Sequence, residues 1–306
     1  MKLPLIYHPG YSPEFDANHR FPMEKFARLY DRLENIGLLR HCELFRPEPA
    51  NEATIRLAHH PDYVTGYRDN QLSAKAMRRI GLPWSEGVMR RTFLAVGGSL
   101  LSTELALERG LAAHLAGGTH HAHYQEGSGF CIFNDLAICA RHALTKPGID
   151  RVLIIDTDVH QGDGTARILD NDPDILTVSF HCRQNFPARK AHSNWDFELD
   201  HQSGDQTYLN LVHRHIPYLL DITEPDLVLY DAGADVHQDD ALGLLNLTDD
   251  GIYQRDVFIL SECAYRNIPV SCVIGGGYMK DRKRLAEVHS IIHQAAFDVW
   301  REYYQR

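Results

Sequence analysis

The chain alternates short apolar runs with longer segments whose apolar residues recur at helical spacing, and this alternation constrains the fold most. The run "VLIID" at residues 152–156 is typical of a strand that is buried on both faces. Further strands are predicted within residues 3–7, 110–118, 175–181, 225–233 and 269–278, with a short one at the start of 53–67 before a helix. Helices are predicted at 23–39, 91–109, 134–144, 205–220 and 249–266, and from about Lys283 onward. This order predicts one α/β domain over residues 1–306, a mostly parallel sheet with helices on both faces.

Four of the predicted strands end in polar, glycine-rich turns. These turns are "GGTHHAH", "DTDVHQGDG", "DAGAD" and "GGGY". In parallel α/β sheets, ligands bind outside the carboxyl ends of the strands, so the side chains of these turns are expected to meet in one site.

The turn after residue 155 carries residue types that bind metals. Asp158 and His160 offer an oxygen and a nitrogen ligand, and Asp235 offers a second oxygen from another strand end. Three protein ligands with open positions are typical of a catalytic metal. This mixed ligand set suits Zn²⁺ and also Fe²⁺ or Mn²⁺. An isolated Asp-x-His at a strand end is usually a capping aspartate and a surface histidine, but here four neighbouring turns carry catalytic residue types.

The adjacent histidines His120 and His121 follow a pair of glycines and suit the roles of general base and general acid. Each needs a partner that orients its second ring nitrogen, and Asp156 and Asp163 are the available carboxylates. Tyr278 follows three glycines, and its phenol could stabilise an oxyanion or merely fill the core.

Composition indicates which classes of ligand and which cellular compartment are expected. The net charge of −10 argues against nucleic acid as the main ligand and is compatible with a cationic substrate. The N-terminal segment is too short in apolar residues for a signal peptide, and no stretch suits a membrane span. The six cysteines form no CxxC pair, so reduced thiols in the cytoplasm are expected. The oligomeric state is not determined by the sequence.

The blocks "GGTHHAH…SGFCIFND", "IIDTDVHQGDG", "YDAGAD" and "GGGY" resemble the signatures of the histone deacetylase superfamily, metal-dependent deacylases with the arginase/deacetylase fold. The resemblance covers nearly the whole chain. "IIDTDVHQGDG", "ALERG" and "DDALGLLNLTDDGIYQRD" look most like class IV members and their bacterial relatives.

The resemblance implies a role for each matching residue. Asp158, His160 and Asp235 would bind zinc, His120 and His121 would be the tandem catalytic histidines backed by Asp156 and Asp163, and Tyr278 would polarise the scissile carbonyl. Gly129, Phe130, Phe186 and Gly276 would contact the acyl chain of the substrate. Asp156, Ser179 and Phe180 would help to hold a structural K⁺ or Na⁺. The implied substrates are acyl-lysine peptides or proteins and acylated small amines.

Three alternatives remain open. The chain could be an acetylpolyamine amidohydrolase, or a two-metal ureohydrolase of the same fold, since "DTDVH" faintly resembles the aspartate-rich strand ends of that family. It could also be a non-catalytic acyl-lysine-binding module. The adjacent histidines and Tyr278 favour a catalytic one-metal deacylase.

Overall fold

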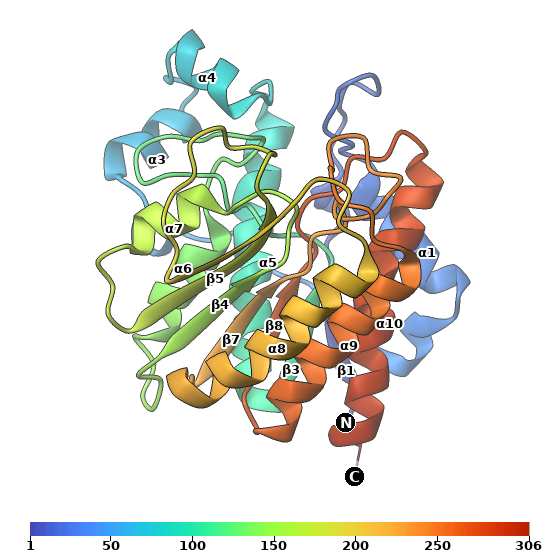
Figure 1. The fold of residues 1–306 in the computed structure, drawn as a ribbon. Coiled ribbons are helices and arrows are strands. Elements are labelled where there is room, and N and C mark those ends of the chain that lie inside the picture. Colours follow the sequence, from blue (N-terminus) through green and yellow to red (C-terminus); the bar gives the residue numbers. More distant parts are fainter. Residues whose placement is uncertain (306) are drawn as a thin grey trace.

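The strands form one parallel sheet in the order β2-β1-β3-β8-β7-β4-β5-β6, in a computed structural model that describes residues 1–305 (Figure 1). The strands are β1 (Leu3–Ile6), β2 (Cys42–Phe45), β3 (Leu111–His114), β4 (Val152–Asp156), β5 (Ile175–Cys182), β6 (Trp195–Leu199), β7 (Leu227–Asp231) and β8 (Val270–Val273). The α-helices are α1 (Lys25–Asn35), α2 (Glu52–Ile55), α3 (Pro61–Arg68), α4 (Ala74–Ile80), α5 (Glu86–Arg109), α6 (Asp135–Ala143), α7 (Asp163–Leu169), α8 (Asp205–Thr223), α9 (Asp249–Tyr265) and α10 (Arg282–Tyr303). The predicted α/β fold is confirmed.

Helices cover both faces of the sheet. Helices α1, α8, α9 and α10 form one layer, and α5, α6 and α7 lie on the opposite face (Figure 1). The central strands β4, β7 and β8 are therefore buried at every residue, as their continuous apolar runs require. The burial of these strands fixes where their carboxyl ends, and the polar turns that follow, must lie.

The strand order brings the candidate turns together. In the chain β4 follows β3, but in the sheet β8 and β7 lie between them. The loops after β3, β4, β7 and β8 therefore leave the same edge of four successive strands. This is the topological position at which open α/β sheets bind ligands.

Most predicted elements agree with the structure, and one is wrong. The short strand expected at the start of residues 53–67 is instead the helical turn α2, in which the Asn51 side chain accepts a hydrogen bond from the Thr54 backbone. That cap satisfies a backbone N–H that a helix start otherwise leaves unpaired, so it favours a turn over a strand. Strands β2 and β6 and helices α4 and α7 were not predicted.

Membrane-spanning helices and the pairing of the cysteines can both be checked in the fold. No helix within residues 1–305 is long and apolar enough to cross a membrane. All six cysteines are buried and none is paired in a disulfide, in agreement with the expected reduced thiols.

A buried histidine fixes the loop that carries the tandem histidines. The His59 Nε2 accepts a hydrogen bond from the Asn134 backbone (2.8 Å), and its Nδ1 lies 3.0 Å from the carbonyl oxygen of His123. One ring nitrogen must accept and the other donate, so His59 is neutral in the fold. Burial lowers the pKa of His59 from 6.5 to about 4.

His59 is expected to make the fold less stable in mild acid. Because the folded pKa is lowered, the unfolded chain binds this proton first, so stability falls as pH drops from 6.5 toward 4. Between about pH 6.5 and pH 5, the single group should remove about 1.5 kcal/mol from the free energy of unfolding. Urea unfolding of the wild type and of His59→Gln should show this difference in pH dependence. Exposed His41→Gln is the control, and parallel curves for wild type and His59→Gln would contradict the assignment.

Candidate active site

Asp158, His160 and Asp235 meet at the carboxyl ends of β4 and β7. The His160 Nδ1 lies 3.0 Å from Asp158 Oδ1 and 3.1 Å from Asp235 Oδ2, and all three side chains are buried. Ligands bound tetrahedrally at 2.0–2.1 Å would lie roughly 3.3 Å apart, which is close to the separations seen here. The three predicted metal ligands are thus brought together from two separate loops.

The backbone holds both carboxylates in place. The Gly276 N–H donates to Asp158 Oδ2 (2.7 Å), and the Val159 N–H donates to Asp235 Oδ1 (2.9 Å). A Cβ at position 276 would lie 2.0 Å from Asp235 Oδ2, so the backbone can approach the carboxylates only as glycine. Gly276 therefore lies beside the metal-ligand candidates.

The three side chains fit a metal ion. Among the described residues, the buried Asp235 Oδ2 has no hydrogen-bond partner, so its lone pairs are free to bind a cation. Burial and the nearby charge of Asp158 raise the pKa of Asp235 to about 7, a sign of carboxylates crowded together without a compensating cation. Burial alone would lower the pKa of His160, but Asp158 and Asp235 raise it to about 10. A bound cation would relieve this crowding.

The tandem histidines are held by different carboxylates. The His120 Nδ1 lies 2.7 Å from Asp156 Oδ2, and the His121 Nδ1 lies 2.8 Å from Asp163 Oδ1. Asp156 ends β4 and Asp163 begins α7, so both orienting partners come from the loop that also carries Asp158. Each histidine therefore lies against one of the two carboxylates named for the pair.

The two histidines are tuned in opposite directions. Burial alone would lower the pKa of His120, but the charges of Asp156 and Asp158 outweigh burial and raise that pKa well above its ordinary value. Burial and the neighbouring charge of His120 lower the pKa of His121 to about 3. One ring is thus disposed to carry a proton and the other to stay neutral, so that the two histidines differ in charge, as paired acid and base groups do.

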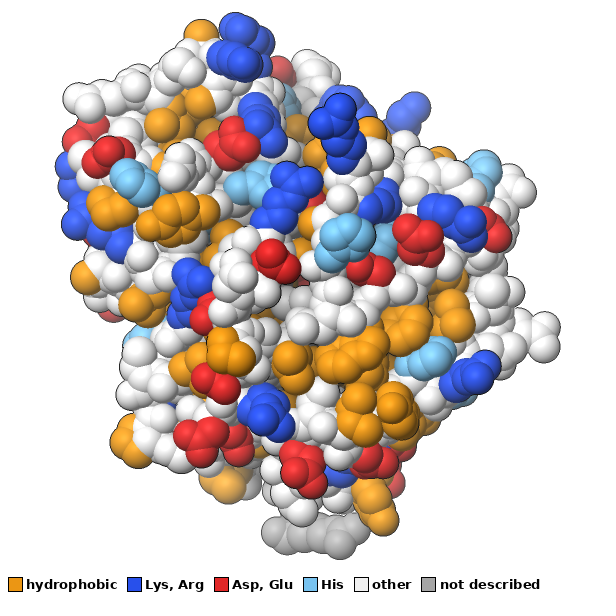
Figure 2. Space-filling view, turned by 60° about the vertical axis from the view of Figure 1, so that its left-hand side comes forward, with side chains coloured by type: hydrophobic (Ala, Val, Ile, Leu, Met, Phe, Trp, Pro, Cys, Tyr) orange, Lys and Arg blue, Asp and Glu red, His pale blue; other side chains and the backbone are white. Residues whose placement is uncertain are grey.

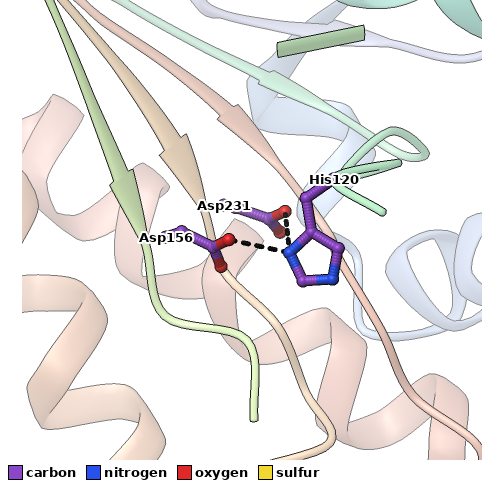
Figure 3. Close-up of side chains that lie close together, drawn as sticks. All are labelled: His120, Asp156 and Asp231. Carbon is purple, nitrogen blue, oxygen red and sulfur yellow. Dashed lines mark hydrogen bonds and ion pairs between the residues drawn. The ribbon is translucent and has the colours of Figure 1, made fainter. Parts of the chain in front are cut away.

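Asp231 is a buried carboxyl that the sequence analysis did not assign (Figure 3). Its position pairs with Asp156 across β4 and β7, its Oδ2 lies 3.9 Å from the His120 Nδ1, and neither of its oxygens has a hydrogen-bond partner. Burial, followed by the charge of Asp156, raises the pKa of Asp231 well above its ordinary value. A protonated Asp231 would add no charge beside His120 and leave Asp156 as its charged partner.

Tyr278 and three of the four predicted acyl-binding residues, Gly129, Phe130 and Phe186, line one groove of about 830 Å³. The fourth, Gly276, is not among the residues that line it. The Phe186 ring lies edge-on to His121, with centroids 4.8 Å apart, and the Phe130 ring lies 5.8 Å from that of Tyr278. Gly129 and Phe130 both have positive φ, and Phe130 is a bulky residue in this region (φ 67°). Such a conformation is held against its strain by the surrounding structure, and it is typical of functional sites.

The residues of the predicted monovalent-cation site lie next to the metal-ligand candidates. Ser179 and Phe180 are buried on β5, and Ser179 pairs with Asp156 in the sheet register. The Ser179 Oγ lies 2.9 Å from the His181 Nδ1, and Asp156 Oδ1 accepts a hydrogen bond from the Asp158 backbone. The structural K⁺ or Na⁺ stays a prediction.

Arg255 is a fully buried cation that the sequence analysis missed. Its Nη1 donates to the carbonyl oxygens of Thr157 (3.2 Å) and Gly233 (3.0 Å), and its Nε donates to Asp256 (2.8 Å). The two carbonyls belong to the loops that carry Asp158 and Asp235, so the buried guanidinium links these two loops. In the helical pattern of α9, Arg255 and Asp256 occupy the buried stripe with Ile252 and Ile259, and a charged pair at core positions could have revealed them.

Arg255→Met is expected to lower the free energy of unfolding by about 3–5 kcal/mol, because Asp256 would stay buried without its cation. Adding Asp256→Asn should restore part of the loss. Because the linked loops carry the metal-ligand candidates, zinc affinity in competition with a chelator should also fall. Arg266→Met, at the end of the same helix, removes a more exposed ion pair and should change stability by less than about 1 kcal/mol. An Arg255→Met protein as stable as the wild type would contradict this role.

A third residue that was not predicted is Lys25, a buried amine on α1. Its Nζ donates to the carbonyl oxygen of Gly275 (3.2 Å), in the turn that leads to Tyr278. Burial lowers the pKa of Lys25 to about 8, although Asp235 and Asp158 act in the opposite direction. No sequence signal separates this lysine from the exposed lysines of an amphipathic helix.

Comparisons with known proteins show the family of this chain. The sequence matches the histone deacetylase domain over residues 19–294. It is 48% identical over 300 residues to an uncharacterized protein of Picosynechococcus, covering 98% of this chain and 100% of that protein. It is 29% identical to histone deacetylase 2 of Arabidopsis thaliana (93% of this chain, 76% of that protein) and 28% identical to acetoin utilization protein AcuC of Bacillus subtilis (97% and 81%). The expected family is confirmed, and this chain belongs to the histone deacetylase family.

Proposed function

We propose that this protein is a metal-dependent amide hydrolase that removes acetyl or longer acyl groups from lysine side chains or related amines. Its family and the names of its relatives support deacetylase activity. The observation that carries the proposal is a groove lined by His160 of the metal-ligand cluster, by His121 of the tandem pair and by Tyr278. The oppositely tuned His120 lies directly beside His121.

Asp158, His160 and Asp235 would hold the metal, which we propose to be Zn²⁺, with Fe²⁺ as the alternative. When bound, such an ion supplies a Lewis acid that activates water and polarises an amide carbonyl. The wider ligand shell supports this role, because Gly276 and Val159 orient the two carboxylates through their backbone N–H groups.

The proton transfers fall to the two histidines, and the tyrosine stabilises the developing negative charge. His121, neutral and held through its Nδ1 by Asp163, is placed to accept a proton from the attacking water at Nε2. The Tyr278 hydroxyl would donate a hydrogen bond to the carbonyl oxygen as negative charge develops on it. A histidine of the pair then gives a proton to the departing nitrogen. Water and amide are thereby converted to a carboxylate and a free amine.

The groove sets which acyl groups can be accepted. Gly129, Phe130 and Phe186 line it, and the resemblance to class IV enzymes supports a tunnel that accepts chains longer than acetyl. Each additional buried methylene would add roughly 0.8 kcal/mol to binding in an open apolar tunnel. We also propose a cytoplasmic location, which the unpaired cysteines support, and a substrate other than nucleic acid.

The two-metal ureohydrolase alternative has one observation in its favour. His120, Asp156 and Asp231 form a second cluster of metal-ligand types beside the first. However, the His120 Nδ1 to Asp156 Oδ2 distance of 2.7 Å is that of a direct hydrogen bond, which supports a proton between these atoms. Metal analysis of the purified protein distinguishes the alternatives, with one bound metal expected for the deacylase.

A panel of fluorogenic acyl-lysines with acetyl, butyryl, octanoyl and myristoyl groups, together with acetylpolyamines, tests the proposed activity. We expect turnover of acyl-lysines, including chains longer than acetyl. Activity confined to acetyl-lysine would contradict the open tunnel, and activity confined to acetylpolyamines would favour that alternative. A protein that binds acyl-lysine without turnover would be a binding module.

A further inference from the structure

Arginines surround the mouth of the groove. Five of them line it, contributed by four separate segments: Arg20 before α1, Arg78 and Arg79 on α4, Arg167 on α7, and Arg189 in the loop after β5. All five side chains are exposed. We refer to these five residues as the arginine ring.

Little negative charge balances the arginine ring. Among the residues that line the groove, Asp163 is the one carboxylate, and it is buried and bonded to His121 and His123. Arg79 forms an ion pair with Glu126 (2.6 Å). Within residues 1–305, the other four arginines have no carboxylate within 4.0 Å.

The local charge is opposite in sign to the charge of the whole chain. The chain has 41 acidic and 31 basic residues, yet the groove mouth is cationic. In Figure 2, Lys and Arg side chains gather over the upper part of the visible face, the end of the molecule at which α4 lies. A single-sign cluster around a concave site concentrates ligands of the opposite charge and speeds their association.

We propose that the arginine ring selects acyl-amines that carry carboxylates elsewhere on the same molecule, such as an acyl-lysine whose neighbouring residues in the peptide are acidic. This inference rests on the proposed function. The acyl chain would enter the tunnel between Phe130 and Phe186, while the flanking carboxylates stay at the mouth, where guanidinium groups bind them in bidentate geometry. The same ring disfavours cationic substrates such as polyamines and lysine-rich tails, which the net charge of the chain alone would allow.

Three acetyl-lysine peptides that differ only in their flanking residues, Glu, Gln or Lys, test the proposal. At about 0.02 M ionic strength, kcat/KM should be about 10-fold higher with Glu than with Gln and lowest with Lys. At about 0.3 M the three values should converge, because salt screens exposed charges. Blocked acetyl-lysine with a free α-carboxylate, compared with its carboxamide, reports whether one carboxylate is enough or whether an acidic peptide is needed.

Variants connect the preference to the ring. In the double variant Arg78→Gln/Arg189→Gln, the ratio of kcat/KM for the Glu-flanked peptide to kcat/KM for the Gln-flanked peptide should fall from about 10 to about 2 or less. Arg214→Gln, an exposed arginine on α8 outside the groove, is the matched control and should keep the preference. Equal kcat/KM for the three peptides, or an unchanged preference in the double variant, would overturn the inference and leave the proposed function intact. Failure of every acyl-lysine substrate would overturn the proposed function itself.

Discussion

Asp235→Ala is expected to lose the bound metal and, with it, all measurable hydrolysis of acyl-lysine. The variant removes one of three ligands and leaves Asp158 and His160, which come from a single loop. The fold should persist, because the sheet and its core are assembled without the metal-ligand side chains, unlike a zinc finger, which is unfolded without metal.

Three measurements on the same preparation check this prediction: metal content by elemental analysis, folding by circular dichroism, and turnover of acyl-lysine. Asp235→Asn keeps the volume of the side chain and guards against a folding failure in the alanine variant. Asp250→Ala, an exposed aspartate at the start of α9, is the control and should keep both metal and activity. Full metal occupancy in well-folded Asp235→Ala protein would show that the metal is held elsewhere.

Tyr278→Phe is expected to lower kcat on the order of 10²–10³-fold, with metal content and thermal stability nearly unchanged. The substitution keeps the ring that packs near Phe130 and His160 and deletes only the hydroxyl. That hydroxyl would interact more strongly with the oxyanion of the transition state than with the bound amide, so kcat should fall more than KM changes. Tyr265→Phe, at a tyrosine that is 75% exposed on α9, is the matched control. Wild-type turnover in Tyr278→Phe would reduce the tyrosine to a packing role.

His121→Ala should be at least as damaging, because it removes the base that accepts a proton from water. His121 is not among the metal-ligand candidates, so the metal should be retained. In the double variant His121→Ala/Tyr278→Phe, kcat should fall by less than the product of the two single-variant reductions, as expected for groups that act in one step.

The sequence predicts the sheet and the metal-ligand candidates well, for physical reasons. Strands such as β4 and β7 are buried on both faces and therefore appear as apolar runs with clear ends. Because parallel strands end at one edge, residues that follow such runs meet in space. This logic brings Asp158, His160 and Asp235 together and places the tandem histidines beside them.

The features that were missed depend on tertiary contacts between distant segments. The helical pattern of α9 places Arg255 at a core position, but its link to the active-site loops depends on the two carbonyls that it binds, one in each loop. The arginine ring joins four segments whose individual arginines look like ordinary surface residues. Strand β6 at the sheet edge is mostly half-exposed, so it lacks the continuous apolar run of a central strand.

Zinc titration of metal-stripped protein tests whether a single catalytic metal is held by Asp158, His160 and Asp235. Bound zinc and the rate of acyl-lysine hydrolysis are measured on the same samples as metal is added. We expect no turnover without metal, a rate that rises in proportion to bound zinc and a plateau at one zinc per chain. Asp235→Asn should show neither tight binding nor turnover. Turnover by the metal-free protein, or activity that requires a second bound metal, would contradict the single-metal site.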